Sequence, residues 1–377
     1  MAGGNILCVF GTRPEAIKLA PVIRELRSHP QLRLTTCITG QHREMLEGVW
    51  KLFDIEPDID LQIMRPGQSL NEMTAMILNR LGDVFAQSQP DCVLVQGDTT
   101  SVMATALAAF HARIPLAHLE AGLRTWDLQS PWPEEMNRRV TTLAAALHFC
   151  PTQAAAENLQ REGVPPERIT VTGNTVIDAF LDVRKRIETD GALRQECRKQ
   201  FAFLDNQRKL ILVTGHRREN FGDRLTAICR AVVRLSRRDD VQIVYPVHLN
   251  PNVQETVREI LDGAANVTLM PPVDYPQFVF LLSRAAVVLT DSGGVQEEAP
   301  AAGKPVLVTR DTTERPEGVA AGTVKLVGAD ENRIVAEVSR LLDDAQAYAA
   351  MAKAINPYGD GRAASRVAQR LAEEFGS

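Results

Sequence analysis

The sequence lacks a metal-binding cysteine pattern, a long apolar run and an excess of basic residues. Its six cysteines are scattered, with no CxxC pair and no Cys/His spacing that suits zinc. No segment approaches the ~20 consecutive apolar residues that span a bilayer, and the N-terminal segment has no basic region of the kind that begins a secretion signal. The formal net charge of −5 gives no field that attracts nucleic acid. We therefore predict reduced cysteines, no resident metal, a cytoplasmic location, and no binding to nucleic acid or membrane.

The length and the apolar pattern predict two α/β domains. A chain of 377 residues exceeds the usual size of one domain, and 45% hydrophobic residues suffice for packed cores. Short runs rich in Val, Ile and Leu alternate with segments of helical period, which indicates parallel sheets. Strands are predicted at 6–10, 32–39, 92–96, 115–118, 147–150, 169–172, 209–214, 241–246, 267–270, 287–290, 305–308 and 324–327. The clearest helical patterns cover 16–28, 70–87, 101–110 and 135–145.

The repetition of this pattern places one doubly wound domain in each half of the chain. We predict an N-terminal domain at 1–177 and a C-terminal domain at 178–360. The charged segment 178–207 has no strand pattern and is interpreted as the linker region. The amphipathic segment 361–377 is expected to form a helix that packs back on the N-terminal domain.

Ligands of open parallel sheets bind beyond the carboxyl ends of the strands, so the polar residues that follow each strand are candidates. After the first strand, Arg13 and Lys18 flank a helix start at Pro14, where free N–H groups favour an anion. Neither GxGxxG nor GxxxxGK[ST] occurs, so dinucleotide and P-loop sites lose their main support. A solvated loop with two surface cations is the alternative for these residues.

Three carboxylates follow strands or begin a helix in the first half. Asp98 and Glu120 come after neighbouring strands, and Glu134 lies at a helix start fixed by prolines. Helix capping would explain Asp98 or Glu134 individually but not all three together. Such a cluster can supply both an acid and a base, whereas a metal site would need closely spaced carboxylates in one loop.

The second half carries anion-binding features at the ends of its strands. His216 follows a strand beside two arginines and could bond or protonate a phosphate. Ser292, Gly293 and Gly294 open a helix and permit close approach of a diphosphate. Further candidates are Glu298 for a ribose, Arg315 for the diphosphate or sugar, Val273 and Phe278 for a base, and His248 in an accessory role. Phe278 could equally pack in the core.

These residues lie in eight motifs, GTRPEAIKLAP, GDTTS, HLEAGLRT, SPWPEEMNRR, TGHRREN, YPVHLNP, DSGGVQEEAP and RDTTERPEG. In this order, and over nearly the whole chain, they resemble the non-hydrolysing UDP-N-acetylglucosamine 2-epimerases. The resemblance implies two Rossmann-like domains facing a cleft (the GT-B fold), a homodimer, and interconversion of UDP-GlcNAc and UDP-ManNAc without a cofactor. In that reaction UDP is eliminated to leave 2-acetamidoglucal and then adds back. The product would serve cell-surface polysaccharides such as enterobacterial common antigen.

The resemblance also implies roles for individual residues. The family's acid/base groups correspond to Asp98, Glu120, Glu134 and the histidine His216, without indicating which carboxylate takes the C2 proton. The family's substrate-binding residues correspond to Arg13, Lys18, Val273, Phe278, Ser292, Gly293, Gly294, Glu298 and Arg315. A regulatory UDP-GlcNAc site of some members is matched in part by Gln41, Glu135, Arg217 and His248. Glu44 and Gly67 stand where those members carry glutamine and arginine, which argues against allosteric activation.

Three other functions remain open from the residues alone. A glycosyltransferase of the same fold, or a hydrolysing epimerase that releases UDP and free ManNAc, would share the nucleotide-binding features. A non-catalytic sensor of nucleotide sugars would bind without turnover. The three carboxylates argue against the transferase, because a glycosyl donor that keeps its configuration at C2 needs no base there.

Overall fold

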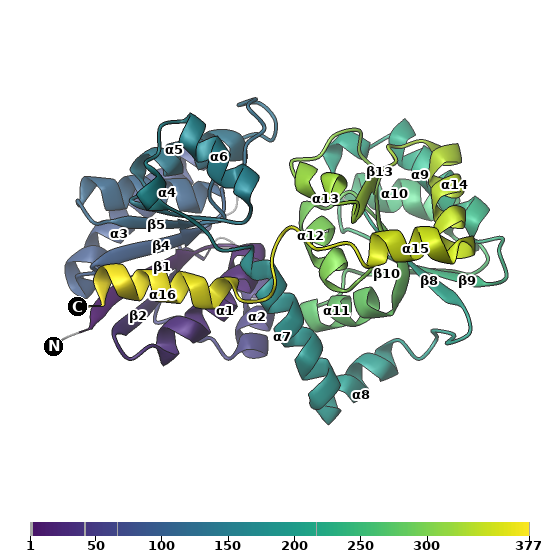
Figure 1. The fold of residues 1–377 in the computed structure, drawn as a ribbon, viewed down its shortest axis with the longest axis horizontal. Coiled ribbons are helices and arrows are strands. Elements are labelled where there is room, and N and C mark those ends of the chain that lie inside the picture. The colour runs from purple at the N-terminus through teal and green to yellow at the C-terminus, as the bar shows by residue number, and fades with distance from the viewer. Residues whose placement is uncertain (1–2, 41–42, 66, 216, 377) are drawn as a thin grey trace. The chain divides into compact units, whose positions relative to one another are not determined.

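The computed structural model describes residues 3–40, 43–65, 67–215 and 217–376. The chain forms two compact units, one made of Met1–Ala179 with Tyr358–Ser377 and the other of Phe180–Pro357 (Figure 1). Each unit is a parallel sheet covered by helices, so the predicted pair of doubly wound α/β domains is confirmed. Within the described residues, no helix is long and apolar enough to cross a lipid bilayer.

The first unit contains a seven-stranded sheet in the order β3-β2-β1-β4-β5-β6-β7. Its strands are β1 (Gly4–Phe10), β2 (Leu32–Ile38), β3 (Ile59–Asp60), β4 (Cys92–Gln96), β5 (Leu116–Leu119), β6 (Leu147–Cys150) and β7 (Ile169–Val171). The helices are α1 (Arg13–Ser28), α2 (Arg43–Phe53), α3 (Leu70–Ser88), α4 (Thr100–His111), α5 (Glu134–Ala144), α6 (Gln153–Arg161) and the C-terminal α16 (Ala363–Phe375). A 3-10 turn covers Pro166–Arg168. The two-residue edge strand β3 was not predicted, because its apolar run is too short to stand out.

The register of β4 and β5 brings two of the predicted carboxylates to one edge of the sheet. All five residues of β4 and all four of β5 are buried, as expected for strands covered on both faces. Gln96, the last residue of β4, pairs with Leu119, the last residue of β5. The loops that begin with Gly97-Asp98 and with Glu120 therefore leave the sheet side by side.

The second unit contains a six-stranded sheet in the order β10-β9-β8-β11-β12-β13. Its strands are β8 (Lys209–Thr214), β9 (Val241–Pro246), β10 (Val267–Met270), β11 (Ala285–Thr290), β12 (Val306–Val308) and β13 (Val324–Leu326). The helices are α8 (Gly191–Gln200), α9 (Asp223–Leu235), α10 (Pro251–Leu261), α11 (Tyr275–Arg284), α12 (Gly293–Ala301), α13 (Pro316–Ala320), α14 (Glu331–Asp343) and α15 (Ala345–Ala352), with a 3-10 turn at Arg218–Asn220. The core packs α9, α10 and α14 against the sheet.

The segment 178–207, interpreted from the sequence as a linker region, is largely helical. Helix α7 (Thr175–Thr189) begins in the first unit, and α8 follows it directly. Phe180 and Val183 of α7 are fully buried, so the charges of this segment occupy one face of a packed helix. At the other end of the chain, α16 lies beside α1 and contacts β1 (Figure 1).

Gly122 provides a test of the packing behind the candidate site. Its backbone has φ = +89°, and a Cβ atom there would lie 2.2 Å from the carbonyl oxygen of Ala155. We expect Gly122→Ala to lower the free energy of unfolding by about 3 kcal/mol, since left-handed strain adds to a backbone clash. The matched control is Gly163→Ala, with φ = +85° and no atom within 4 Å of the new Cβ, for which strain alone predicts about 1 kcal/mol. Urea unfolding measures both, and equal losses would contradict the packing argument.

Candidate active site

The first unit contains a cavity of about 420 Å³ at the carboxyl ends of β1 and β4. All three predicted carboxylates, Asp98, Glu120 and Glu134, line it. Lys18 supplies a cationic group to the same wall, and Leu70 supplies an apolar one. The sequence placed these carboxylates on separate loops, and the fold brings them around one space.

Glu120 is the most deeply enclosed of the three carboxylates. Lys18 Nζ donates to both of its oxygens, at 2.7 Å to Oε1 and 2.6 Å to Oε2, and the Glu120 side chain is only 6% exposed. Gln96 Nε2 donates to Oε2, and Asn174 Nδ2 donates to Oε1 at 3.0 Å. Two carboxylate oxygens offer about four lone-pair directions, so these donors occupy nearly all of them. Glu120 also has φ = +64°, which is a left-handed backbone conformation. This conformation is strained for a residue other than glycine, so it persists only where the surrounding structure fixes it.

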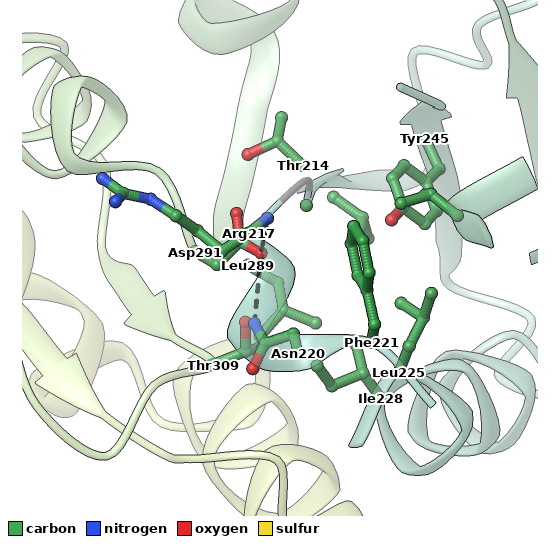
Figure 2. A pocket seen from close by; sticks show the side chains of 13 residues that line it. Thr214, Arg217, Asn220, Phe221, Leu225, Ile228, Tyr245, Leu289, Asp291 and Thr309 are labelled. Carbon is green, nitrogen blue, oxygen red and sulfur yellow. Dashed lines mark hydrogen bonds between the residues drawn. The ribbon is translucent and has the colours of Figure 1, made fainter. Parts of the chain in front are cut away.

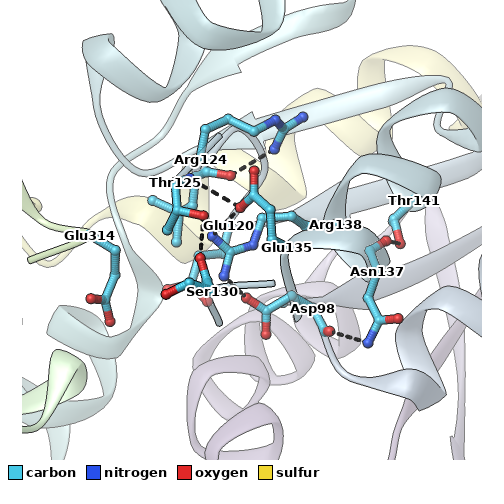
Figure 3. A network of polar contacts seen from close by, with 12 residues as sticks. Asp98, Glu120, Arg124, Thr125, Ser130, Glu135, Asn137, Arg138, Thr141 and Glu314 are labelled. Atoms are coloured by element: carbon cyan, nitrogen blue, oxygen red, sulfur yellow. Dashed lines mark hydrogen bonds and ion pairs between the residues drawn. The ribbon is translucent and has the colours of Figure 1, made fainter. Parts of the chain in front are cut away.

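Asp98 is held by the start of α5 and remains accessible from the cavity (Figure 3). Arg138 Nη2 donates to Asp98 Oδ2 at 2.8 Å, and Asn137 Nδ2 donates to the Asp98 carbonyl at 2.9 Å. The Asp98 side chain is 29% exposed, compared with 6% for Glu120. Asp98 therefore combines a fixed orientation with an open oxygen.

Glu134 occupies the first turn of α5 and lines the cavity beside Pro133. It is partly exposed, and among the described residues no hydrogen-bonding or charged partner engages its carboxylate. The free N–H groups of a helix start favour a negative charge at this position. Glu134 is thus available to a ligand.

Glu135, the neighbouring predicted regulatory residue, has a different environment. It is fully buried and accepts hydrogen bonds from the backbone of Thr125 and Trp126, at 3.1 and 3.2 Å (Figure 3). Arg138 Nη1 lies 3.2 Å from its Oε2. Glu135 therefore fixes the loop that precedes α5 and shares Arg138 with Asp98.

Sequence reasoning missed several residues that shape this cavity. Glu15 is buried and accepts from the backbone N–H of Gly11 and Thr12, both at 2.7 Å, and from Thr99 Oγ1 at 2.6 Å. Burial raises the pKa of the Glu15 carboxyl. The pair Thr12 and Glu15 forms a capping box, a pattern visible in the sequence. Glu15 ties the turn after β1 to the loop after β4.

His118 supports the Asp98 loop from inside the sheet. Its Nε2 lies 2.8 Å from the carbonyl oxygen of Gly97, and because a carbonyl only accepts, that nitrogen carries the proton. Complete burial lowers the pKa of His118 to about 4, so the ring is neutral at pH 7. This contact could not be predicted from the sequence, because it depends on the pairing of β4 with β5.

In the second unit, the predicted diphosphate residues gather at the start of α12. Ser292 is the N-cap residue, and Gly293 and Gly294 form the first turn, where backbone N–H groups are available to an anion. A Cβ atom at Gly293 would lie 2.6 Å from Arg315 Nη1, so glycine is needed for the arginine to approach. Arg315 is held by Glu297 Oε1 at 2.5 Å and Glu314 Oε1 at 2.9 Å.

Glu314 is the centre of a cluster of three arginines. Besides Arg315, it accepts from Arg310 Nη1 at 2.6 Å and from Arg217 Nη2 at 3.1 Å. Burial alone would raise the pKa of Glu314, but the charges of Arg315, Arg310 and Arg217 hold it well below its usual range. One carboxylate thus orients three cations at this edge of the sheet.

A small cavity of about 10 Å³ lies beneath the turn that follows β8 (Figure 2). Asp291 accepts there from the backbone N–H of Arg217 at 3.0 Å and from Asn220 Nδ2 at 3.1 Å. The volume is at the lower limit for one water molecule, so this cavity is a packing feature of the turn.

The remaining predicted residues have mixed surroundings. Tyr275 Oη donates to Glu298 Oε1 at 2.6 Å, which fixes the carboxylate proposed for a ribose. Val273 and Phe278 are partly exposed around the start of α11, and His248 is exposed after β9. Arg13 is the first residue of α1 and is partly exposed.

His216 and Gln41 lie outside the described residues. In the part of the chain that the structure describes, no three His, Cys, Asp or Glu side chains are placed so that they could hold one metal ion.

The sequence profile of the UDP-N-acetylglucosamine 2-epimerase family matches residues 24–372. The UDP-N-acetylglucosamine 2-epimerase of Salmonella typhimurium is 56% identical over 368 residues, covering 97% of this chain and 98% of that protein. The chain belongs to the UDP-N-acetylglucosamine 2-epimerase family. This membership confirms the family predicted from the eight motifs.

Solved structures of this epimerase family have the same fold. The Neisseria meningitidis UDP-GlcNAc 2-epimerase bound to UDP-GlcNAc matches with a TM-score of 0.93 at 48% identity, over 98% of this chain and all of that chain. The Methanocaldococcus jannaschii UDP-GlcNAc 2-epimerase in complex with UDP-GlcNAc and UDP matches with a TM-score of 0.83 at 32% identity, over 98% and 99% of the two chains.

The arginine cluster predicts a pH-dependent contribution to stability. Because the folded pKa of Glu314 is lowered from 4.5, its contribution is fully present above about pH 4.5 and is lost as the pH falls below that value. We expect Glu314→Gln to lower the free energy of unfolding by about 3 kcal/mol at pH 7 and by less at pH 3.

Urea unfolding at the two pH values measures the difference. The control Asp311→Asn breaks an exposed pair with Arg224 at 2.9 Å and should cost less than about 1 kcal/mol. A Glu314→Gln effect that is equal at pH 7 and pH 3 would contradict the assignment.

Proposed function

We propose that this protein interconverts UDP-GlcNAc and UDP-ManNAc by eliminating UDP and adding it back. The observation that carries the proposal is the cavity of the first unit, which three carboxylates and Lys18 border. The similarity to the Salmonella typhimurium UDP-N-acetylglucosamine 2-epimerase and to the Neisseria meningitidis enzyme bound to UDP-GlcNAc supports the same substrate.

Epimerisation at C2 requires proton transfer on both faces of the sugar. In the forward step a base takes the C2 proton, the C–H electron pair forms the C1=C2 bond, and the C1–O bond breaks so that UDP leaves with its electron pair. In the return step a carboxylic acid on the opposite side donates a proton to the other face of C2, the electron pair of the C1=C2 bond forms the new C–H bond, and a UDP oxygen bonds to C1. Two carboxylates with open oxygens on one cavity fit this requirement, because one can start as base and the other as acid.

We assign proton transfer to Asp98 and Glu134 rather than to Glu120. Asp98 retains an exposed oxygen and Glu134 has no engaged partner among the described residues, whereas the oxygens of Glu120 are occupied by three donating side chains. In this proposal Glu120 holds the Lys18 ammonium at the cavity wall. Lys18 then stabilises the negative charge that develops on the departing diphosphate.

We assign nucleotide binding to the second unit. The N–H groups at Ser292–Gly294 and the guanidinium of Arg315 are suited to a diphosphate, and Glu298 to the ribose. Val273 and Phe278 are assigned to uracil, Arg13 to the diphosphate, and His216 to general acid catalysis. A homodimer, a cytoplasmic location and supply of ManNAc for polysaccharides belong to the same proposal. Regulatory roles for Gln41, Glu135, Arg217 and His248 do not, because Glu44 and Gly67 argue against allosteric activation.

The product distribution tests the function. Purified protein is incubated with UDP-GlcNAc, and the nucleotides and free sugars are separated by ion-exchange chromatography. We expect an equilibrium mixture of UDP-GlcNAc and UDP-ManNAc. Stoichiometric UDP and free ManNAc would assign the protein to the hydrolysing class, and an unchanged substrate would refute enzymatic epimerisation.

Removing the charge of Asp98 tests its proposed role in proton transfer. We expect Asp98→Asn to lower kcat by about 100-fold or more while the Kd for UDP stays within about twofold, because an amide of the same shape cannot exchange the proton. Asp83→Asn, at an exposed position of α3, is the control for loss of one charge. Steady-state kinetics and calorimetric titration with UDP give the two values. Turnover equal to wild type would remove Asp98 from the mechanism.

A further inference from the structure

The chain leaves the first unit along α7 and returns at Tyr358, and these two crossings are joined within that unit. We call Thr172–Asp178 the exit segment and Tyr358–Arg366 the return segment. Hydrogen bonds connect the two segments at several points. Asn174 N–H donates to the Tyr358 carbonyl at 2.6 Å. The Asp178 carboxylate accepts from the N–H groups of Ala363 and Ala364, at 3.2 and 2.9 Å. Further along, Arg366 Nη1 donates to the Thr172 carbonyl at 2.9 Å.

Close packing reinforces these bonds. A Cβ atom at Gly173, where φ is +88°, would lie 3.3 Å from both Gly359 Cα and the Tyr358 carbonyl oxygen. Tyr358 itself is only 1% exposed. A side chain at Gly173 would thus be crowded by the backbone of the return segment. The return segment therefore fixes the position of the turn that contains Asn174.

The side chain of Asn174 connects this junction to the cavity. Its Oδ1 accepts from Val176 N–H at 3.1 Å at the start of α7, which settles the orientation of the amide. Its Nδ2 then points to Glu120 and donates to Oε1 at 3.0 Å. Asn174 is only 3% exposed, so its side of this bond is shielded from solvent.

The charged donor to Glu120, Lys18, belongs to a helix that packs against the C-terminal part of the chain. Lys18 lies on α1, and α16 packs along α1 (Figure 1). Of the donors to Glu120 from outside the sheet, Asn174 is thus bonded to the return segment, and Lys18 lies on a helix that packs against α16. Gln96, the remaining donor, comes from the end of β4.

We propose that Asn174 is a positioning residue for Glu120, and that the return segment holds Asn174 in place. Correct docking of the C-terminal segment is then a condition for an ordered cavity. This inference rests on the proposed function, since Glu120 is assigned there to hold Lys18 against the leaving diphosphate.

The variant Asn174→Asp separates the two roles of this side chain. An aspartate keeps the oxygen that caps α7, but it replaces the donor to Glu120 with a second carboxylate. Around Glu120 the charged or titratable neighbours are Lys18 on α1, His118 on β5, Glu15 on α1, and Asp98 and Glu134 across the cavity. The new carboxylate would add a like charge at direct contact with Glu120.

We expect Asn174→Asp to lower kcat by about 10- to 100-fold at a temperature where circular dichroism shows the variant folded, and to lower the thermal midpoint, because two buried carboxylates in contact repel each other. The Glu120 carboxyl, followed by 13C NMR in labelled protein, should titrate about one pH unit or more higher than in the wild type. Asp330→Asn, the opposite exchange at the N-cap of α14, is the control and should change neither value.

A second variant tests the return segment. Gly173→Ala should displace Tyr358 and Gly359 and lower kcat without altering any group that contacts Glu120 directly, whereas Gly163→Ala, with a similar φ and open space, should not. Wild-type kcat and an unshifted Glu120 titration in Asn174→Asp would overturn the positioning role, and wild-type kcat in Gly173→Ala would overturn the role of the return segment. The NMR titration requires no turnover, so failure of the wild type to convert UDP-GlcNAc would count against the proposed function alone.

Discussion

The carboxylate of Glu120 is buried, and a buried charge is tolerated only where donors surround it. Lys18, Gln96 and Asn174 meet this requirement from α1, from the end of β4 and from the turn before α7. These three points are far apart in the sequence, so the charge can be compensated only when the sheet, α1 and the chain crossing are all in place. The cavity and its other carboxylates are organised around this one group.

The candidate site of the first unit is lined by carboxylates, whereas that of the second unit is lined by arginines. The functions proposed for the two units follow from this difference in charge. In the first unit Asp98 and Glu134 keep oxygens open to a cavity, as proton transfer requires. In the second unit Glu314 gathers Arg217, Arg310 and Arg315 beside the start of α12. Oriented cations and a helix N-terminus bind an anion without further rearrangement, which suits a diphosphate.

Much of the fold was predictable because buried parallel strands are continuous apolar runs. Strands such as Cys92–Gln96 and Lys209–Thr214 were predicted with the bounds that the structure has. Asp98 and Glu120 were found because residues that follow such strands must meet at one edge of the sheet, and Glu134 was found at a helix start fixed by prolines. Their assembly around a single cavity needed the register of β4 and β5, which no local pattern gives. Asn174 was missed for the same reason, since 54 residues separate it from Glu120. The edge strand Ile59–Asp60 was too short to recognise, and the charged face of α7 concealed its buried one.

We propose that the carboxylates of the first unit remove and return the C2 proton of a UDP-linked N-acetyl sugar. Proton NMR of the purified protein with UDP-GlcNAc in D2O tests it directly, by following the C2 proton and the products over time. We expect UDP-ManNAc that carries deuterium at C2, formed at the rate of epimerisation. UDP-ManNAc that retains the original proton at C2 would contradict it.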